Sequence, residues 1–225
     1  MRYLPTLCLA LSFVTNANEE NIKAVKLDDT SICYPAKYSP NTSFMSAYLA
    51  PIKDQLDSSE GQELIYISAL AIKDKVPEYS LSHINKHGVD FEHKLMGLAY
   101  AKSQINLQGM AKSAWHVYSE KKSVYVEKDP NLPYTRVYEY HEPFFMWHLV
   151  KYPPMKEPNK PMPSDWYIGS CSESAGSFNC RQVAEYESVY YEYDLQAQDM
   201  HLRKQVNLAV VELFRNWNLK CGDYL

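Results

Sequence analysis

The most regular pattern of apolar positions lies near the C-terminal end of the chain. The apolar positions step by three or four residues, and they are Val183, Tyr186, Tyr190, Tyr193, Ala197 and Met200. After one shift in phase the pattern continues through Val206, Val210, Leu213 and Trp217. Such spacing is typical of one face of an α-helix, so we predict one long helix over residues 180–217. A helix of that length needs a partner for its apolar face, either the rest of the chain or another subunit.

A second helical pattern covers residues 90–114. Phe91, Leu95, Leu98 and Met110 belong to a set of apolar positions spaced mostly by three and four residues, and Asp90 can cap the start. We predict an amphipathic helix here.

Other segments have the composition of β-strands. Residues 63–72 form a compact, partly β-branched run that predicts a buried strand. Aromatic and β-branched residues alternate with charged ones over 115–119, 123–127 and 135–141, which predicts half-exposed strands. Residues 129–133, Asp-Pro-Asn-Leu-Pro, predict the turn between the last two.

The remaining segments predict little regular structure. Five prolines within residues 153–163 predict an extended connector. Residues 18–43 show no sustained period and predict an extended arm, and a short helix is expected over 44–56.

The predicted fold is therefore α+β, with a small, mainly antiparallel sheet and a long C-terminal helix packed on it. Its expected segments are a signal peptide (1–17), an N-terminal arm (18–59), an α/β core (60–152), a connector with a cysteine loop (153–179) and the C-terminal helix (180–225).

The first residues predict export. Arg2 precedes an apolar run from Leu4 to Val14, and Thr15-Asn16-Ala17 places small residues at −3 and −1 of a cut before Asn18. The run is shorter than the roughly 20 residues that a membrane-spanning helix needs. Cys8 lacks the small residue that should precede a lipid-modified cysteine, so we expect no lipid anchor. The expected location is the periplasm or the periplasmic face of the outer membrane.

Four cysteines follow the predicted signal. An even number in an exported chain favours two disulfides, and we predict Cys171 with Cys180 across a short Ser/Gly-rich loop, leaving Cys33 with Cys221. The two other pairings and a zinc site stay open, although the C-x₂₋₄-C spacing of zinc ligands is missing from the sequence.

Charge and motifs exclude several classes of function. The net charge is −4 without long basic runs, which argues against nucleic acid as the main partner. The sequence has no G-x-S-x-G motif and no Gly-rich phosphate loop among its seven glycines. We expect no catalytic residues, no cofactor and no metal.

Two groups of residues keep an enzymatic interpretation open. His83 and His87 have the spacing of a zinc pair on one helical face, with His93 nearby, although surface histidines explain them as well. The carboxylates of the predicted C-terminal helix allow acid/base work by an exported hydrolase together with Glu92, although a solvated helix face explains them more simply. These carboxylates are Glu185, Glu187, Glu192, Asp194 and Asp199.

Nineteen tyrosines need an explanation of their own. They cluster at Tyr134, Tyr138 and Tyr140 and again between Tyr186 and Tyr193. Tyrosine is enriched where proteins meet proteins, and it also fills core edges, so both interpretations stay open. The partner-binding residues that we predict are Tyr186, Tyr190, Tyr193 and Trp147.

Three segments share a pattern with one known family. They are residues 96–106 (Met-Gly-Leu-Ala-Tyr-Ala-Lys-Ser-Gln-Ile-Asn), residues 142–153 (Glu-Pro-Phe-Phe-Met-Trp-His-Leu-Val-Lys-Tyr-Pro) and residues 182–202. In this order they resemble a Gly-Leu-Ala…Gln-Ile-Asn helix, a Pro…Trp stretch before a Tyr-Pro linker, and the closing helix of the DotC component of type IVB (Dot/Icm-type) secretion systems.

The resemblance implies a non-catalytic structural subunit of an outer-membrane core complex, assembled with other secretion or conjugation subunits into a ring. A soluble periplasmic binding protein, such as an immunity or inhibitor protein, is the alternative from a different class.

Overall fold

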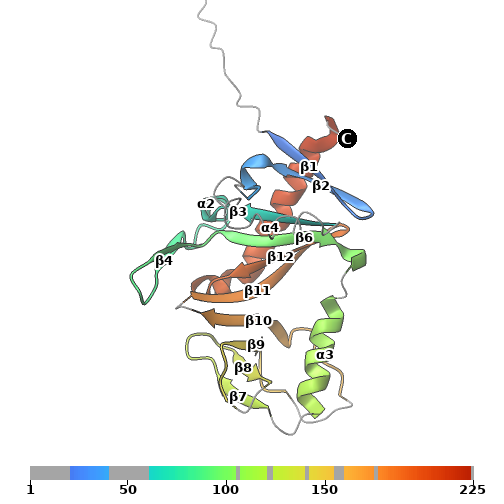
Figure 1. Ribbon diagram of the computed structural model, residues 1–225. Helices are drawn as coiled ribbons and strands as arrows, with labels where there is room; N and C mark the ends of the chain where they lie inside the picture. The colour runs from blue at the N-terminus through green and yellow to red at the C-terminus, as the bar shows by residue number, and fades with distance from the viewer. Residues whose placement is uncertain are drawn as a thin grey trace, which may run out of the picture.

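The computed structural model describes residues 21–40, 61–104, 107–120, 124–139, 142–154, 160–174 and 177–223. The predicted signal peptide and the predicted helix over 44–56 lie outside these residues. The dominant element is an antiparallel sheet of eight strands in the order β3-β6-β12-β11-β10-β9-β8-β7 (Figure 1). In that order the strands are Gln62–Ile67, Leu95–Ala101, Val189–Leu195, Ser177–Tyr186, Tyr167–Ser174, Met146–Val150, Thr135–Tyr138 and Tyr125–Lys128.

Among the residues that the structure describes, two hairpins and three α-helices complete the fold. The hairpins are β1–β2 (Ile22–Leu27 and Thr30–Pro35) and β4–β5 (Ser82–Ile84 and Asp90–Glu92). The α-helices are α2 (Ala69–Lys73), α3 (Leu107–Glu120) and α4 (Arg203–Leu219). Short 3₁₀ helices are η1 (Ala36–Tyr38), η2 (Lys102–Gln104), η3 (Ala197–Leu202) and η4 (Lys220–Asp223). The α+β class is confirmed, but the sheet is large where a small one was predicted.

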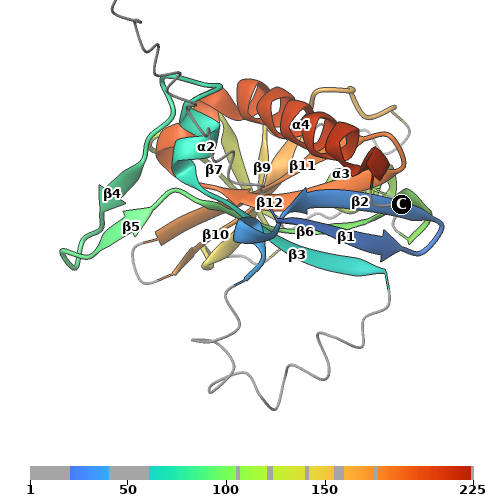
Figure 2. The same ribbon diagram turned by 90° about the horizontal axis from the view of Figure 1, so that it is seen from above.

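The helices α3 and α4 cover opposite faces of the sheet, in different halves. In β8 and β9, Tyr138 and Leu149 belong to the apolar cluster that contains Phe214 of α4, whereas Val137 and Val150 pack with Trp115 of α3. Neighbouring residues of a strand point to opposite faces, so the two helices do not share a face. Figure 2 shows α4 lying along one side of the sheet. Part of each face therefore carries no helix among the described residues.

The predicted C-terminal helix is correct only for its second half. Residues 180–202 form β11, β12 and η3, and the helix begins at Arg203. In β12, Val189, Tyr191 and Tyr193 are buried, whereas the residues between them face the other side of the sheet. The connecting turn contains Glu187 at φ 47°, a position where glycine or asparagine usually signals a hairpin. Because the sequence lacks that hairpin signal, the three- and four-residue spacing of its apolar residues wrongly predicted a helix.

The helix predicted over residues 90–114 is also wrong for most of its length. Residues 95–101 form β6, a central strand that pairs with both β3 and β12. Every residue of β6 is apolar, including Met96, which is 47% exposed, so this strand lacks the apolar/polar alternation that identifies a strand. Gly97 permits the close pairing, because a Cβ there would lie 2.4 Å from the carbonyl oxygen of Glu192.

The strand predicted over residues 115–119 is wrong, because these residues lie in α3. Trp115 and Tyr118 are buried together with Ala114, so one face of this helix packs inward.

The other strand predictions are confirmed in part. Residues 62–67 form β3, and Ser68 then starts α2 by accepting a hydrogen bond at Oγ from the N–H of Ala71 at 3.3 Å. The strands β7 and β8 match the prediction, and the carboxylate of Asp129 holds their turn by accepting the N–H groups of Asn131 and Leu132, each at 2.9 Å.

Both predicted disulfides are present. Cys33 of β2 pairs with Cys221 of η4, with Cα atoms 5.9 Å apart, so the hairpin β1–β2 is fixed to the C-terminal helix. Residues 18–43 were predicted to be an extended arm, and the described part of them contains this paired hairpin. Cys171 and Cys180 stand directly opposite each other in β10 and β11, with Cα atoms 4.0 Å apart.

The described parts of the proline-rich segment, residues 153–154 and 160–163, lie outside helices and strands, as predicted. Among the helices that the structure describes, none combines the length and the apolar character required to cross a membrane.

Candidate functional site

A groove lies between the tip of the hairpin β4–β5 and the strands β7 to β10. We call it the hairpin groove, and its volume is about 340 Å³. It is on the sheet face of Tyr138 and Trp147, in the half of the sheet that α3 covers on the opposite side. It is lined by Lys86, Glu127, Arg136, Tyr138, Pro143, Phe144, Phe145, Trp147 and Glu173.

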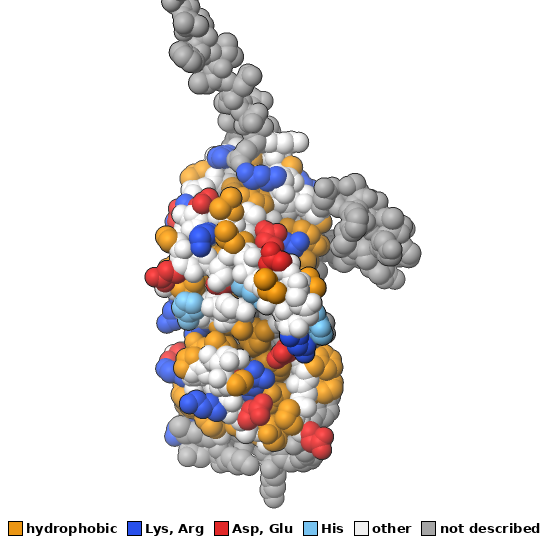
Figure 3. Space-filling model, turned by 90° about the vertical axis from the view of Figure 1, so that its left-hand side faces the viewer, with side chains coloured by type: hydrophobic (Ala, Val, Ile, Leu, Met, Phe, Trp, Pro, Cys, Tyr) orange, Lys and Arg blue, Asp and Glu red, His pale blue; other side chains and the backbone are white. Residues whose placement is uncertain are grey.

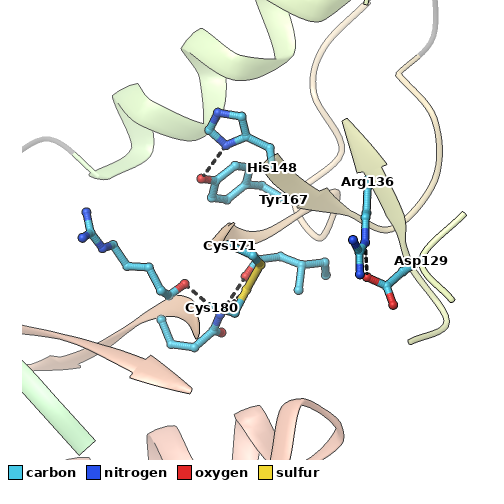
Figure 4. The surroundings of a disulfide bond; sticks show 9 residues. Asp129, Arg136, His148, Tyr167, Cys171 and Cys180 are labelled. Carbon is cyan, nitrogen blue, oxygen red and sulfur yellow. Dashed lines mark hydrogen bonds and ion pairs between the residues drawn. A yellow bond between two sulfur atoms is a disulfide. The ribbon is translucent and has the colours of Figure 1, made fainter. Parts of the chain in front are cut away.

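The floor of the hairpin groove is a fixed polar network. The guanidinium of Arg136 lies over the ring of Trp147, 4.1 Å from the centroid, and its Nε donates to the carboxylate of Asp129 at 2.6 Å. Figure 4 shows this ion pair near the disulfide of Cys171 and Cys180. The hydroxyl of Tyr138 donates to Glu127 at 2.7 Å. Burial lowers the pKa of Arg136, but its hydrogen bonds with Tyr138 and Asp129 outweigh that and raise it. The floor therefore holds its geometry before any partner arrives.

The rim of the groove is apolar and exposed. Phe144 and Phe145, which we call the aromatic rim, have exposed fractions of 45% and 52%. The aromatic rings of the two phenylalanines contact each other, with centroids 4.2 Å apart. Contiguous exposed apolar side chains of this size mark sites of interaction.

The hairpin on the other side of the groove is apolar as well. Its exposed large apolar residues are Leu81, Ile84, Val89 and Phe91, of which Ile84 is 72% exposed. Figure 3 shows the side of the molecule that carries this hairpin, with apolar side chains in both its upper and its lower part. The hairpin and the aromatic rim thus offer apolar contact area from two separate elements.

A partly buried relay of two histidines and one aspartate joins this hairpin to the core. Nδ1 of His83 lies 2.7 Å from Nε2 of His93, whose Nδ1 pairs with the carboxylate of Asp199. The side chains of His93 and Asp199 are fully buried. The second oxygen of Asp199 accepts the N–H of Ser80 at 3.0 Å, and Tyr79 donates to the carbonyl of His93 at 2.6 Å.

For neutral rings, the hydrogen bonds of the relay define the tautomers of both histidines. The Asp199 carboxylate can only accept, so His93 donates from Nδ1. A neutral His93 then accepts at Nε2 from Nδ1 of His83, which leaves Nε2 of His83 as an acceptor toward the hairpin surface. Burial and the neighbouring His93 lower the pKa of His83, although Asp90 and Asp199 oppose them. His83 also stacks on Phe91, with ring centroids 5.9 Å apart, so the relay supports an exposed apolar residue.

The structure brings together only part of the predicted histidine cluster. The spacing of His83 and His87 would suit one helical face, but His83 lies in β4 and His87 lies in the hairpin turn, where its N–H donates to Asn85. Among the described residues, no group of three or more His, Cys, Asp or Glu side chains is placed to hold a metal ion.

The predicted tail carboxylates do not converge on one site. Asp199 joins the histidines, whereas Glu192 accepts a hydrogen bond from Arg181 at 3.0 Å on the sheet. Glu185 and Glu187 are exposed, and Glu185 pairs with Lys102. Burial raises the pKa of Asp194, although Arg181 opposes this.

The residues predicted to bind a partner lie in or beside the main apolar cluster. Tyr186, Tyr193 and Trp147 are buried in the main apolar cluster, and Tyr190 is half-buried. Tyr186 and Tyr193 belong to the core because they occupy inward positions of strands, whereas Tyr190 lies on the other face of β12 and Trp147 also lines the hairpin groove. The aromatic rim was not predicted, although two consecutive phenylalanines directly after Pro143 are a signal for it.

Comparison of this chain with protein-family models, with curated proteins and with solved structures finds no match. The resemblance to the DotC component implies helices at residues 96–106 and 182–202, where the structure contains β6, β11 and β12.

Proposed function

We propose that this chain is a non-catalytic, partner-binding protein of the bacterial envelope, which docks onto another protein through the hairpin groove. The observation that carries this proposal is a preformed groove with an exposed aromatic rim, flanked by the hairpin β4–β5, which lines the groove with Lys86 and carries further exposed apolar residues. Protein interfaces combine an apolar centre of aromatic and Met side chains with fixed polar groups, including arginine.

The disulfides support an extracytoplasmic location for the protein. Two disulfide pairs indicate an oxidising, extracytoplasmic environment. We propose the periplasm, or the periplasmic face of the outer membrane, because residues 1–17 have the pattern of a cleavable signal.

The partner that we propose is a subunit of a secretion or conjugation apparatus. The groove is open and its rim is apolar, which suits a protruding loop or helix of another protein. In a ring that contains many copies of this chain, a neighbouring subunit would occupy the hairpin groove of every copy. A soluble immunity or inhibitor protein would use the groove for one tight partner instead.

A matched pair of surface variants tests the proposal. Phe145→Asp places a charge in the aromatic rim, and Leu208→Asp places the same charge at a residue of α4 that is 70% exposed. The protein is isolated from the envelope fraction of cells that produce it, and its complexes are separated by size. We expect the wild type and Leu208→Asp to co-migrate with a partner and Phe145→Asp to migrate as free protein.

The size of the complex separates the two proposed roles. A large assembly supports the secretion subunit, and a complex with one small partner supports the binding or inhibitor protein. Equal recovery of the partner with Phe145→Asp and with the wild type would contradict docking at the hairpin groove.

A further inference from the structure

The hairpin β4–β5 is attached to the rest of the molecule through its base. Among the strands that the structure describes, β4 and β5 pair only with each other, and Figure 2 shows the hairpin projecting from the side of the molecule. At the base, the N–H of His93 donates to the carbonyl of Leu81 at 2.8 Å and joins the two chain ends of the hairpin. The relay lies at this same base and connects the hairpin to Asp199 of η3. The relay is therefore placed to control how firmly the hairpin is held.

The contact between the two histidine rings holds one proton. Nδ1 of His83 and Nε2 of His93 lie 2.7 Å apart, so one nitrogen carries a hydrogen and the other accepts it. Nδ1 of His93 is already bonded to the carboxylate of Asp199. When both rings are neutral, Nε2 of His83 is the one ring nitrogen of the relay that can still be protonated. The relay can therefore take up a single proton and keep all of these hydrogen bonds.

A second proton breaks the contact between the rings. It puts an N–H on both of the nitrogens that face each other, and two donors repel at that distance. The side chain of His93 is fully buried, so its N–H finds no water there. The rings must separate, and His83 then moves away from the core together with β4. A detached hairpin leaves both histidines in water, where each takes up a proton near its ordinary pKa of about 6.5.

Charged and titratable groups of the neighbouring elements surround the relay. Burial raises the pKa of Tyr79, which keeps its hydroxyl protonated while it donates to the carbonyl of His93 at 2.6 Å. Lys73 donates from Nζ to the carbonyl of Tyr79 at 2.8 Å. Histidine is the side-chain type that titrates between about pH 5 and 8, so the two rings set the response of the relay to mild acid. The carboxylates around the relay are Asp90 and Glu92 in β5 and Asp199 in η3.

The direction of the pH dependence follows from the count of protons. Below about pH 6, the attached hairpin binds one proton fewer than the detached one, so a fall in pH favours detachment. The pKa of His83 agrees with this direction, because burial and the neighbouring His93 lower it, although Asp90 and Asp199 oppose them. A histidine with a lowered pKa stabilises the attached state above its ordinary pKa, and this stabilisation is lost as the pH falls.

We propose that mild acid detaches the hairpin β4–β5 from the core, because the relay holds one proton where two free histidines hold two. The proton comes from the solvent through Nε2 of His83, and only hydrogen bonds break. Lys86 of the hairpin lines the hairpin groove, so detachment removes one side of the groove. A partner bound there leaves at acidic pH, and this consequence alone rests on the proposed function.

Hydrogen exchange of the free, disulfide-intact protein measures the detachment directly. The reporter amides are those of His93 and Ser80, which form hydrogen bonds at the base of the hairpin. From their protection factors between about pH 5 and 7.5, we expect the equilibrium constant for opening to rise by up to about tenfold per pH unit below about pH 6. The amide of Asp129, which donates to the carbonyl of Tyr134 in another part of the molecule, should keep a constant protection factor.

A matched pair of variants assigns the effect to the relay. His83→Asn places an amide where Nδ1 of His83 lies, and this amide can donate to or accept from Nε2 of His93 and does not titrate. The variant should lose the pH dependence of opening. His87→Asn removes a histidine from the exposed turn of the same hairpin and should keep the pH dependence of the wild type. An unchanged protection factor at Asp129 shows that both variants fold.

Two results would overturn the proposal. In one, the opening of the wild type at His93 and Ser80 does not change between these pH values. In the other, His83→Asn keeps the pH dependence of the wild type. The measurement on the wild type decides by itself if His83→Asn does not fold.

Release of the partner is tested separately, with the complex from the envelope fraction washed at about pH 7.5 and about pH 5.5. We expect the wild type to lose its partner at the lower pH and His83→Asn to retain it. If Phe145→Asp abolishes docking but the wild type retains its partner at the lower pH, the regulation is contradicted and the proposed function stands. If Phe145→Asp has no effect, the proposed function itself is contradicted.

Discussion

At the scale of single residues, the relay of His83, His93 and Asp199 shows how distant positions form one network. The two histidines are ten residues apart, and Asp199 lies 106 residues beyond His93. The sequence suggested that the histidines belong together, because they cluster. It offered Asp199 only as one of five carboxylates of the predicted C-terminal helix and did not single it out as their partner, because that contact depends on where η3 meets the hairpin β4–β5.

Asp199→Asn should invert the tautomers along this relay. An amide can keep its oxygen toward the N–H of Ser80, but it then presents NH₂ to His93. His93 must accept at Nδ1 and donate from Nε2, so His83 accepts at Nδ1 and carries its proton on Nε2. Nitrogen NMR of the two rings should show this exchange of tautomers, and the free energy of unfolding should fall by about 1–3 kcal/mol.

Asp90→Asn is the control for that variant, because Asp90 acts on His83 only at a distance and is exposed. It should leave the tautomers unchanged. An Asp199→Asn protein with the ring spectra of the wild type would show that the hydrogen bonds do not set the tautomers.

At the scale of elements, the predictions are correct for segments whose local signals favour one structure. They are wrong for segments whose structure depends on pairing with distant strands. The turn at residues 129–133 carries proline and Asx signals, and the strands β7 and β8 around it were predicted correctly. The hairpin β11–β12 carries no such signal at Glu187, and its tyrosines repeat at intervals that also fit a helix. Only pairing with β6 and β10 decides between the two structures.

The two disulfides should differ in their effect on stability. They close loops with sequence separations of 188 and 9 residues. The chain-entropy account assigns about 5 kcal/mol to the longer loop and about 3 kcal/mol to the shorter one. We therefore expect Cys33→Ser/Cys221→Ser to lower the free energy of unfolding more than Cys171→Ser/Cys180→Ser, as measured by urea denaturation without reductant. The opposite order would show that the short disulfide also maintains the strand pairing of β10 and β11.

At the scale of the whole molecule, the fold is one sheet with helices on opposite faces of its two halves. α4 and the hairpin β1–β2 cover the half that contains β6, β11 and β12, whereas α3 covers the other half from the opposite side. This offset leaves the floor of the hairpin groove without a helix over it among the described residues. The sequence could not predict this surface, because it depends on which face each helix covers.

Site-specific photo-crosslinking measures most directly whether this surface binds a partner. A photoreactive phenylalanine analogue replaces Phe145 in the aromatic rim, and in a second protein it replaces Leu208 on α4, which is at least as exposed. The proteins are irradiated in cells that produce them. Docking at the hairpin groove predicts a discrete crosslinked partner from position 145 and little or none from position 208. No crosslinked partner at position 145, or the same partners from both positions, would contradict it.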